Sequence, residues 1–211
     1  MTKKIIFDVF GVLLSPGFDS AADELALLLN RTVQDIRPVY ERWEIPFDLG
    51  SISESRFWRE VQKDLATDIA WQSLNDAVLR NYKPIRGAFE LLDRCTRTAD
   101  VYLLSNTRRE WFEALDRNFG ITRRVKRAFL SYDMGLAKPD IRCFNYIMSA
   151  LECRAAELYF IDDKLENVIS AQRVGIDSLH FIDSSSTEAR LRLRFPSLLP
   201  PNEDYEARQG L

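Results

Sequence analysis

Apolar runs alternate with amphipathic helical patterns along much of the chain. Five short runs rich in β-branched and aromatic residues predict buried strands, at residues 4–7, 100–107, 127–132, 157–163 and 177–183. Helical spacing of apolar residues follows most of them. Strands that alternate with helices predict right-handed βαβ units and an α/β fold, a Rossmann-like doubly wound parallel sheet. The last part of the chain is polar, with a short helix predicted around residues 188–194 and a loose tail from Pro200.

The alternation is interrupted between the first two strands. Four helical patterns follow one another there, at about residues 20–29, 33–43, 54–65 and 69–79. The N-caps expected for the first three are Asp19 or Ser20, Thr32, and Ser53. This insertion predicts a small α-helical lid on the sheet. The predicted division assigns residues 15–83 to the lid and residues 1–14 and 84–211 to the core.

Composition and charge narrow the class of protein. The 29 basic and 32 acidic residues are interspersed and give a formal charge of -3, which argues against a nucleic-acid-binding protein. No apolar run reaches the ~18 residues of a membrane span, and the chain enters its first strand without a signal peptide. The single histidine, His180, lies in a predicted strand, where we expect a structural role, and the cysteines are scattered. We therefore expect free thiols in a cytoplasmic protein, a monomer or homodimer that binds neither nucleic acid nor membrane.

Chemically active side chains gather where the predicted strands end. Asp8, Ser105 and the pair Asp162 and Asp163 end apolar runs, and Lys138 lies in the Gly/Pro loop "MGLAKPD". In a parallel sheet the carboxyl ends of the strands share one edge, so these groups are expected to meet there. Carboxylates in such a cluster repel one another without a cation, and their oxygens suit Mg²⁺. With a lysine and a hydroxyl to hold a phosphoryl group, the set is typical of phosphoryl transfer.

Four segments in order, "IIFDVFGVL", "VYLLSNT", "LAKPD" and "LYFIDDKLENV", resemble motifs one to four of the haloacid dehalogenase-like hydrolase superfamily. The resemblance covers roughly residues 1–14 and 84–183. The helical insertion resembles the small C1 cap of subfamily I, and "FDLGSISESRFW" is similar to cap sequence of the sugar-phosphatase-like and epoxide-hydrolase-N-terminal-like branches. The resemblance implies a phosphatase-like enzyme whose substrate is a small phosphorylated metabolite.

The resemblance also implies roles for single residues. Asp8 would be the nucleophile that forms an aspartyl-phosphate, and Lys138 would neutralise both Asp8 and the transferred group. Ser105 would bind the phosphoryl group, with Asn106 beside it at the substrate-binding loop. The implied Mg²⁺ ligands are Asp8, Asp163, the backbone carbonyl of Phe10 and, directly or through water, Asp162, with Asn167 supporting the loop.

Phe10 departs from the phosphatase pattern. Phosphatases of this superfamily usually carry a second aspartate there, which protonates the leaving oxygen and then activates water. Phe10 keeps the backbone carbonyl but has no carboxyl group. General acid–base help contributes about 10² to 10⁴ in rate, so ordinary phosphate esters should turn over slowly unless another group takes its place. The cap carboxylates considered for that role are Asp19, Glu44 and Asp48.

Phe10 also keeps other functions open. An aromatic residue at this position resembles the true haloacid dehalogenases, which use no metal and need no general acid for a halide. Those enzymes usually have serine and asparagine in motif four, whereas Asp162 and Asp163 form an intact acidic pair. The first interpretation is therefore a Mg²⁺-dependent phosphatase. The alternatives are a 2-haloacid dehalogenase-type hydrolase and a weakly active or inactive binding protein. A further possibility is that Trp43, Phe47 or Trp58 lines a substrate entrance.

Overall fold

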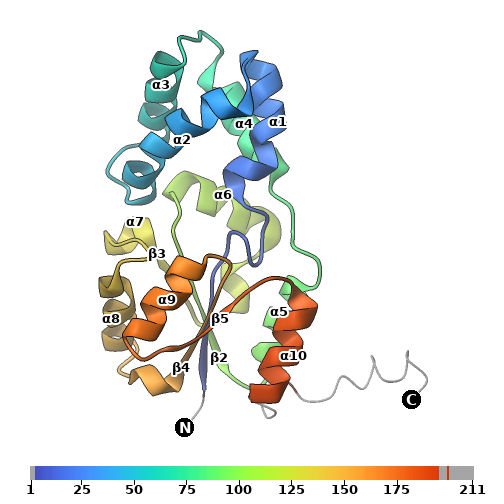
Figure 1. The fold of residues 1–211 in the computed structure, drawn as a ribbon, viewed down its shortest axis with the longest axis vertical. Coiled ribbons are helices and arrows are strands. Elements are labelled where there is room, and N and C mark those ends of the chain that lie inside the picture. The colour runs from blue at the N-terminus through green and yellow to red at the C-terminus, as the bar shows by residue number, and fades with distance from the viewer. Residues whose placement is uncertain (1–2, 195–198, 200–211) are drawn as a thin grey trace, which may run out of the picture.

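The computed structural model describes residues 3–194 and residue 199. Figure 1 shows a parallel sheet beneath a layer of helices; its five strands have the order β3-β2-β1-β4-β5. The strands are β1 (Lys4–Phe7), β2 (Asp100–Ser105), β3 (Arg127–Leu130), β4 (Leu158–Asp162) and β5 (Asp177–His180). The α-helices are α1 (Gly17–Leu29), α2 (Val33–Asp48), α3 (Glu54–Asp64), α4 (Trp71–Asn81), α5 (Ala88–Cys95), α6 (Arg109–Phe119), α7 (Ser131–Met134), α8 (Ile141–Ala150), α9 (Leu165–Arg173) and α10 (Ser184–Arg194).

Helices cover both faces of the sheet. Ile6 and Phe160 pack in a cluster with buried residues of α8 and α9. Ile5 and Ile161 point the other way and pack in a cluster that includes buried residues of α5, α6 and α10. Because both faces are buried, the strands have no polar side and occur as continuous apolar runs. The predicted α/β, doubly wound fold is confirmed.

The order of the strands places a switch point beside β1. From β1 the chain moves outward to β2 and β3, then crosses back and adds β4 and β5 on the other side. Phe7 is in register with Ile161 of β4 and Leu103 of β2. The next residues along β1 and β4, Asp8 and Asp162, therefore emerge at the same level, beside the switch point. Ligands of such sheets bind in the crevice at this position.

Helices α1–α4, which we call the cap, lie above the carboxyl ends of the strands (Figure 1). The chain leaves the core at Leu14 and returns at Pro84, and these two residues form an antiparallel bridge. Beside this bridge the N–H of Ser15 donates to the carbonyl oxygen of Lys83 at 2.8 Å. The pairing supports our proposal that residues 15–83 are an inserted unit.

Two boundaries predicted for the cap were wrong. The first helix begins at Gly17, with Pro16 rather than Asp19 or Ser20 at its N-cap. The second helix continues past Trp43 to Asp48, because Phe47 extends its buried stripe by a further turn in spite of Pro46. The predicted N-caps Thr32 and Ser53 are confirmed, since each accepts a hydrogen bond from a backbone N–H of its helix.

In the core, the third strand ends at Leu130, where Ser131 starts α7, and the final helix begins at Ser184 instead of residue 188. The predicted loose tail from Pro200 lies outside the described residues. Among the residues that the structure describes, no helix has both the length and the apolar character needed to cross a membrane.

Candidate active site

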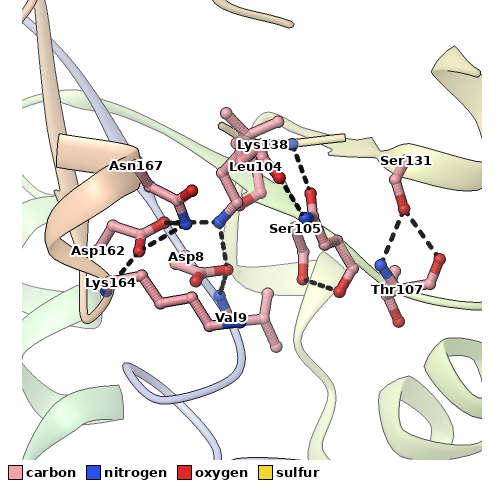
Figure 2. Close-up of polar contacts among 11 residues, drawn as sticks. Asp8, Val9, Leu104, Ser105, Thr107, Ser131, Lys138, Asp162, Lys164 and Asn167 are labelled. Atoms are coloured by element: carbon pink, nitrogen blue, oxygen red, sulfur yellow. Dashed lines mark hydrogen bonds and ion pairs between the residues drawn. The ribbon is translucent and has the colours of Figure 1, made fainter. Parts of the chain in front are cut away.

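Lys138 lies between two aspartates at the switch point. Its ammonium nitrogen lies 2.8 Å from Oδ1 of Asp8 and 2.6 Å from Oδ2 of Asp162. Figure 2 shows the lysine side chain directed at both carboxylates. It also donates to the carbonyl oxygen of Leu104 at 3.0 Å, so all three N–H donors have an acceptor. Burial opposes the charge on this side chain, yet Asp8 and Asp162 raise the pKa of Lys138 above its usual value. The lysine is therefore held protonated against both carboxylates.

Asp8 follows β1 directly and is buried. Its N–H donates to the carbonyl oxygen of Ile161, which fixes the backbone against β4. Its Oδ1 accepts from the N–H of Val9 at 2.7 Å, in addition to facing Lys138. Burial raises the pKa of Asp8 well above its usual range; Lys138 opposes this rise and Asp162 adds to it. A carboxylate in this position is stabilised by added positive charge.

The two aspartates after β4 have different surroundings. Asp162 is fully buried, and the N–H of Lys164 and the side-chain amide of Asn167 donate to it at 2.8 to 3.0 Å. Although burial opposes ionisation, Lys138 and these hydrogen bonds lower the pKa of Asp162. Asp163 differs: its Oδ1 is buried without a hydrogen-bond partner among the described residues, and burial together with Asp162 raises its pKa.

The carboxylates of Asp8, Asp162 and Asp163 form a candidate metal site. Each offers one oxygen, and these oxygens lie within 4.8 Å of one another. Asp8 and Asp162 share the ammonium group of Lys138, and the unpartnered Oδ1 of Asp163 is a hard oxygen ligand. This donor set fits Mg²⁺.

Gly11 makes room for one of these carboxylates. A Cβ built on Gly11 would lie 2.1 Å from Oδ2 of Asp163, closer than any real contact. The residue also has φ of +91°, a conformation that side chains disfavour. The loop after β1 therefore requires glycine where it passes the acidic pair.

Asn106 positions the lysine loop. Its side-chain amide donates to the carbonyl oxygen of Lys138 and accepts from the N–H of Lys138, both at 2.8 Å. These contacts occupy the side-chain amide with backbone and shape the loop, and a contact of Asn106 with the substrate stays a prediction. Ser105 beside it is fully buried, and within the described part of the chain the hydrogen bond of its hydroxyl is a long 3.4 Å contact with the carbonyl oxygen of Asn106. That hydroxyl keeps capacity for a stronger acceptor such as a phosphoryl oxygen.

Phe10 packs against the linker from the cap instead of contributing a polar group. Its ring lies 5.2 Å, between centroids, from the ring of Tyr82, where the chain leaves α4. Nε2 of His180 donates to the carbonyl oxygen of Asp163 at 2.8 Å, in keeping with the structural role expected for it. Phe47 and Trp58 are buried in the cap and do not line an entrance, and Trp43 donates to Asp64 at 3.1 Å.

Arg108 is a residue that sequence reasoning missed. It precedes α6, and its side chain, 5% exposed, lies between the core and the cap. Its guanidinium is 3.0 Å from Oε1 of Glu44 and 3.1 Å from Oδ1 of Asp48. The same group lies over the ring of Trp111, 4.4 Å from its centroid. In "SNTRREW" nothing separates this buried arginine from the exposed Arg109, because only the docking of the cap buries one of them.

A cavity of about 300 Å³ opens between the end of α2 and the loop that carries Lys138. Of the three cap carboxylates considered from the sequence, Asp48 lines this cavity. Asp19 forms an exposed ion pair with Arg37, and Glu44 contacts Arg108 but does not line the cavity. The cavity is lined by Ile45, Asp48, Leu49, Asn106, Gly135, Leu136, Ala137, Lys138, Pro139, Asp140 and Arg142.

Comparison with known proteins finds a matching family and a similar protein. A family model described as haloacid dehalogenase-like hydrolase matches residues 2–175. Sesquiterpene phosphatase astK of Aspergillus oryzae is 29% identical over 161 residues, which are 69% of this chain and 82% of that protein.

Solved structures are similar over most of the chain. A HAD family enzyme of Bacteroides thetaiotaomicron, BT-2542, superimposes with a TM-score of 0.79 at 20% identity, over 90% of this chain and 98% of that one. The same enzyme has been solved in complex with magnesium and inorganic phosphate. L-2-haloacid dehalogenase of Xanthobacter autotrophicus has a TM-score of 0.64 at 18% identity, over 98% of this chain and 88% of that one. At these identities the similarities show the fold.

Proposed function

Because the chain belongs to the haloacid dehalogenase-like hydrolases, as the match over residues 2–175 shows, we propose that it is a Mg²⁺-dependent phosphatase that works through an aspartyl-phosphate at Asp8. The observation that carries this proposal is the position of Lys138 between Asp8 and Asp162, next to the open carboxylate of Asp163. The similarity to a phosphatase at 29% identity supports it.

In the first step an oxygen of Asp8 attacks phosphorus, a bond forms between them, and the bond from phosphorus to the leaving oxygen breaks. Lys138 neutralises Asp8 and then the transferred group, while the Ser105 hydroxyl donates to a phosphoryl oxygen. In the second step water attacks the phosphorus and frees the Asp8 carboxylate and inorganic phosphate. Among the described residues, the hydrogen bond and ion pair of Asp8 both fall on Oδ1, so Oδ2 is the oxygen we assign to attack.

The metal would be held by Asp8, Asp163 and the backbone carbonyl of Phe10. Since the oxygens of Asp162 already accept from Lys138, Lys164 and Asn167, we assign Asp162 to a contact through water. When bound, Mg²⁺ supplies positive charge to the phosphoryl oxygens.

We propose that the substrate is a small phosphorylated molecule with an apolar leaving alcohol. The cavity beside Lys138 is walled largely by aliphatic side chains and backbone of Ile45, Leu49, Leu136 and Pro139. Ile45 is 65% exposed, so apolar surface at this cavity is open to an apolar ligand. The relative named as a sesquiterpene phosphatase supports the same substrate class.

A second candidate, the dehalogenase-type hydrolase, is favoured by Phe10. The acidic pair argues against it, because a dehalogenase that uses no metal gains nothing from the unpartnered carboxylate of Asp163. An inactive binding protein is the third possibility. It would have no catalytic use for a protonated Lys138 held against Asp8.

These candidates are separated by assaying the purified protein on phosphate esters and on 2-haloacids, each with Mg²⁺ and with chelator. The proposal requires Mg²⁺-dependent phosphate release that Asp8→Asn abolishes and that Asp19→Asn, an exposed cap carboxylate, leaves intact. Halide release that survives the chelator overturns it in favour of the dehalogenase. No release of either product across a broad panel overturns it in favour of a binding protein.

A further inference from the structure

Resting on the proposed phosphatase function, we propose that Asp48 is the general acid and base of this enzyme. It would donate a proton to the leaving alcohol and later accept one from the attacking water, the work that Phe10 cannot do. The group would thus come from the cap instead of from the loop after β1.

The end of α2 is fixed above the site. Asp48 is the last residue of this helix and is 8% exposed. Its carbonyl oxygen accepts from the hydroxyl of Ser131 at 2.5 Å, and the N–H of Thr107 donates to the same hydroxyl at 2.9 Å. Both partners belong to the core, next to the ends of β3 and β2. The backbone of Asp48 is therefore anchored to the loops that carry the catalytic groups.

The side chain of Asp48 borders the cavity shared with Asn106 and Lys138. Its Oδ1 is turned to Nε of Arg108 at 3.1 Å, in an ion pair without hydrogen-bond geometry. This orientation leaves Oδ2 as the oxygen that can face a substrate. Arg108 holds the carboxylate in place from the core side, because its guanidinium is itself held by Glu44 and the ring of Trp111.

The charged groups around Asp48 come from several elements. Burial is the largest effect and raises its pKa, Arg108 lowers it, and Glu44 on the same helix raises it. Lys164 and Lys138 from the core loops lower it, and the result is a pKa of about 7. Tyr40 on the same helix and Tyr82 on the linker also lie in this charged cluster. A group with this pKa exists in both forms near neutral pH, as donation followed by acceptance requires.

Other acids near the cavity are less suited. Asp140 also lines it, but its side chain caps α8 and pairs with Arg142, and these hydrogen bonds lower its pKa. It is therefore ionised at the start of the reaction and has no proton to donate. Glu44 is 35% exposed in its side chain and is turned to Arg108.

The proton transfers balance over the two steps. While Asp8 displaces the alkoxide from phosphorus, the protonated Asp48 gives its proton to the alkoxide, which leaves as the alcohol. Asp48 is then a carboxylate, and it takes a proton from water as the water oxygen bonds to phosphorus. Release of phosphate and of the Asp8 carboxylate returns Asp48 to its protonated form.

The test is Asp48→Asn on two substrates, an alkyl phosphate and an aryl phosphate such as p-nitrophenyl phosphate. The alkyl alcohol needs a proton to leave and the nitrophenolate does not. We expect kcat/KM for the alkyl phosphate to fall by about 10² or more, and kcat/KM for the aryl phosphate to change by less than about fivefold. On the aryl phosphate, slow attack of water should give a burst of nitrophenolate and a phosphorylated Asp8 that accumulates.

The matched control is Glu44→Gln, which removes the other carboxylate on Arg108 without touching the cavity. At low pH, where Asp48 keeps its proton in both proteins, this variant should change both substrates alike, and it should give no burst at any pH. Nearer neutral pH the loss of Glu44, which raises the pKa of Asp48, should shift the profile of the alkyl phosphate to lower pH. An equal fall on both substrates for Asp48→Asn, or no fall, overturns the proposal. Failure of the phosphatase proposal looks different: wild type releases no phosphate, or Asp8→Asn stays active.

Wild type offers a readout that does not depend on the folding of a variant. The ratio of kcat/KM for alkyl phosphate to kcat/KM for aryl phosphate should fall as pH rises above about 7, since Asp48 loses its proton there. Effects of pH on Asp8 act on both substrates and cancel in this ratio. The alkyl phosphate loses its second proton at higher pH than the aryl phosphate does, so each kcat/KM is expressed for the dianion before the ratio is taken. The pH at which the ratio falls should agree with the pKa of Asp48 to within about one unit. A ratio that is flat from pH 6 to pH 9 contradicts the assignment of Asp48 as the acid.

Discussion

Gly11 approaches Asp163 so closely that a β-carbon at residue 11 would lie 2.1 Å from Oδ2 of that aspartate. The contact joins the loop after β1 to the loop after β4, the two loops at the switch point. The proposed metal ligands come from the same two loops. The spacing between these loops therefore sets the position of the carboxylate that we assign to Mg²⁺.

Gly11→Ala should weaken Mg²⁺ binding by about tenfold or more, because the methyl group must displace Asp163. Calorimetric titration with Mg²⁺ measures this directly. Gly135→Ala is the matched control: Gly135 also has positive φ, +64°, but a Cβ there meets nothing within 4 Å. Both variants carry the backbone cost of alanine in this conformation, about 1 kcal/mol, and only Gly11→Ala should lose affinity. Equal affinities for the two variants would remove Asp163 from the metal site.

Lys138→Met should destabilise the fold by about 3 to 5 kcal/mol, because Asp8 and Asp162 are left buried without their counter-charge. Urea unfolding followed by circular dichroism gives this value. Lys126→Met removes the ammonium of an exposed pair, 3.7 Å from Asp100, and should cost less than about 1 kcal/mol. If the two lysines cost the same, the carboxylates around Lys138 are neutral in the folded protein and the charge pattern of the site is wrong.

Site residues at strand ends could be predicted from the sequence more fully than site residues in loops. Asp8 and Asp162 lie together because the ends of neighbouring parallel strands share an edge, and apolar runs are enough to locate those ends. Lys138 comes from a Gly/Pro loop, so the pattern predicted it at this edge, whereas its pairing with Asp8 was implied by the resemblance. The strands were therefore predicted better than the contacts.

The contacts between cap and core could not be predicted from any pattern in the sequence. Three cap carboxylates were equal candidates for the general acid and base, Asp19, Glu44 and Asp48. The sequence alone does not show which of them is buried at the site. Asp48 is distinguished by Arg108, and that arginine is buried only because α2 packs over the start of α6. Likewise, Asp162 and Asp163 are neighbours in sequence, yet Asn167 from α9 hydrogen bonds only to the first.

Asn75→Ala should loosen the cap from the core. Its Oδ1 accepts from the indole nitrogens of Trp58, at 2.9 Å in the cap, and of Trp111, at 2.7 Å in α6. Trp58 is fully buried and would lose its acceptor, and a buried donor left unpaired costs about 1 to 3 kcal/mol. Asn118→Ala, at an exposed position of α6, should stay within about 0.5 kcal/mol of wild type in the same urea titration. A cost no larger than that of the control would mean that the indoles find other acceptors and that Asn75 does not join cap to core.

The stability of Asp48→Asn relative to wild type should rise with pH. The pKa of Asp48 is about 7 in the folded protein against an ordinary 3.8, so between these values the folded state keeps a proton that the unfolded state has lost. Wild type therefore loses stability as pH rises from about 4 to about 7, whereas asparagine does not titrate. At about 1.4 kcal/mol for each pKa unit, the difference between the two proteins should grow by at most about 4 kcal/mol across this window. Urea unfolding at pH 5, 6, 7 and 8 measures it, with exposed Asp19→Asn expected to stay within about 1 kcal/mol of wild type at each pH. A difference that stays constant, or shrinks with pH, would show that Arg108 keeps Asp48 ionised throughout, and the proton that the leaving alcohol needs would then have to come from another group.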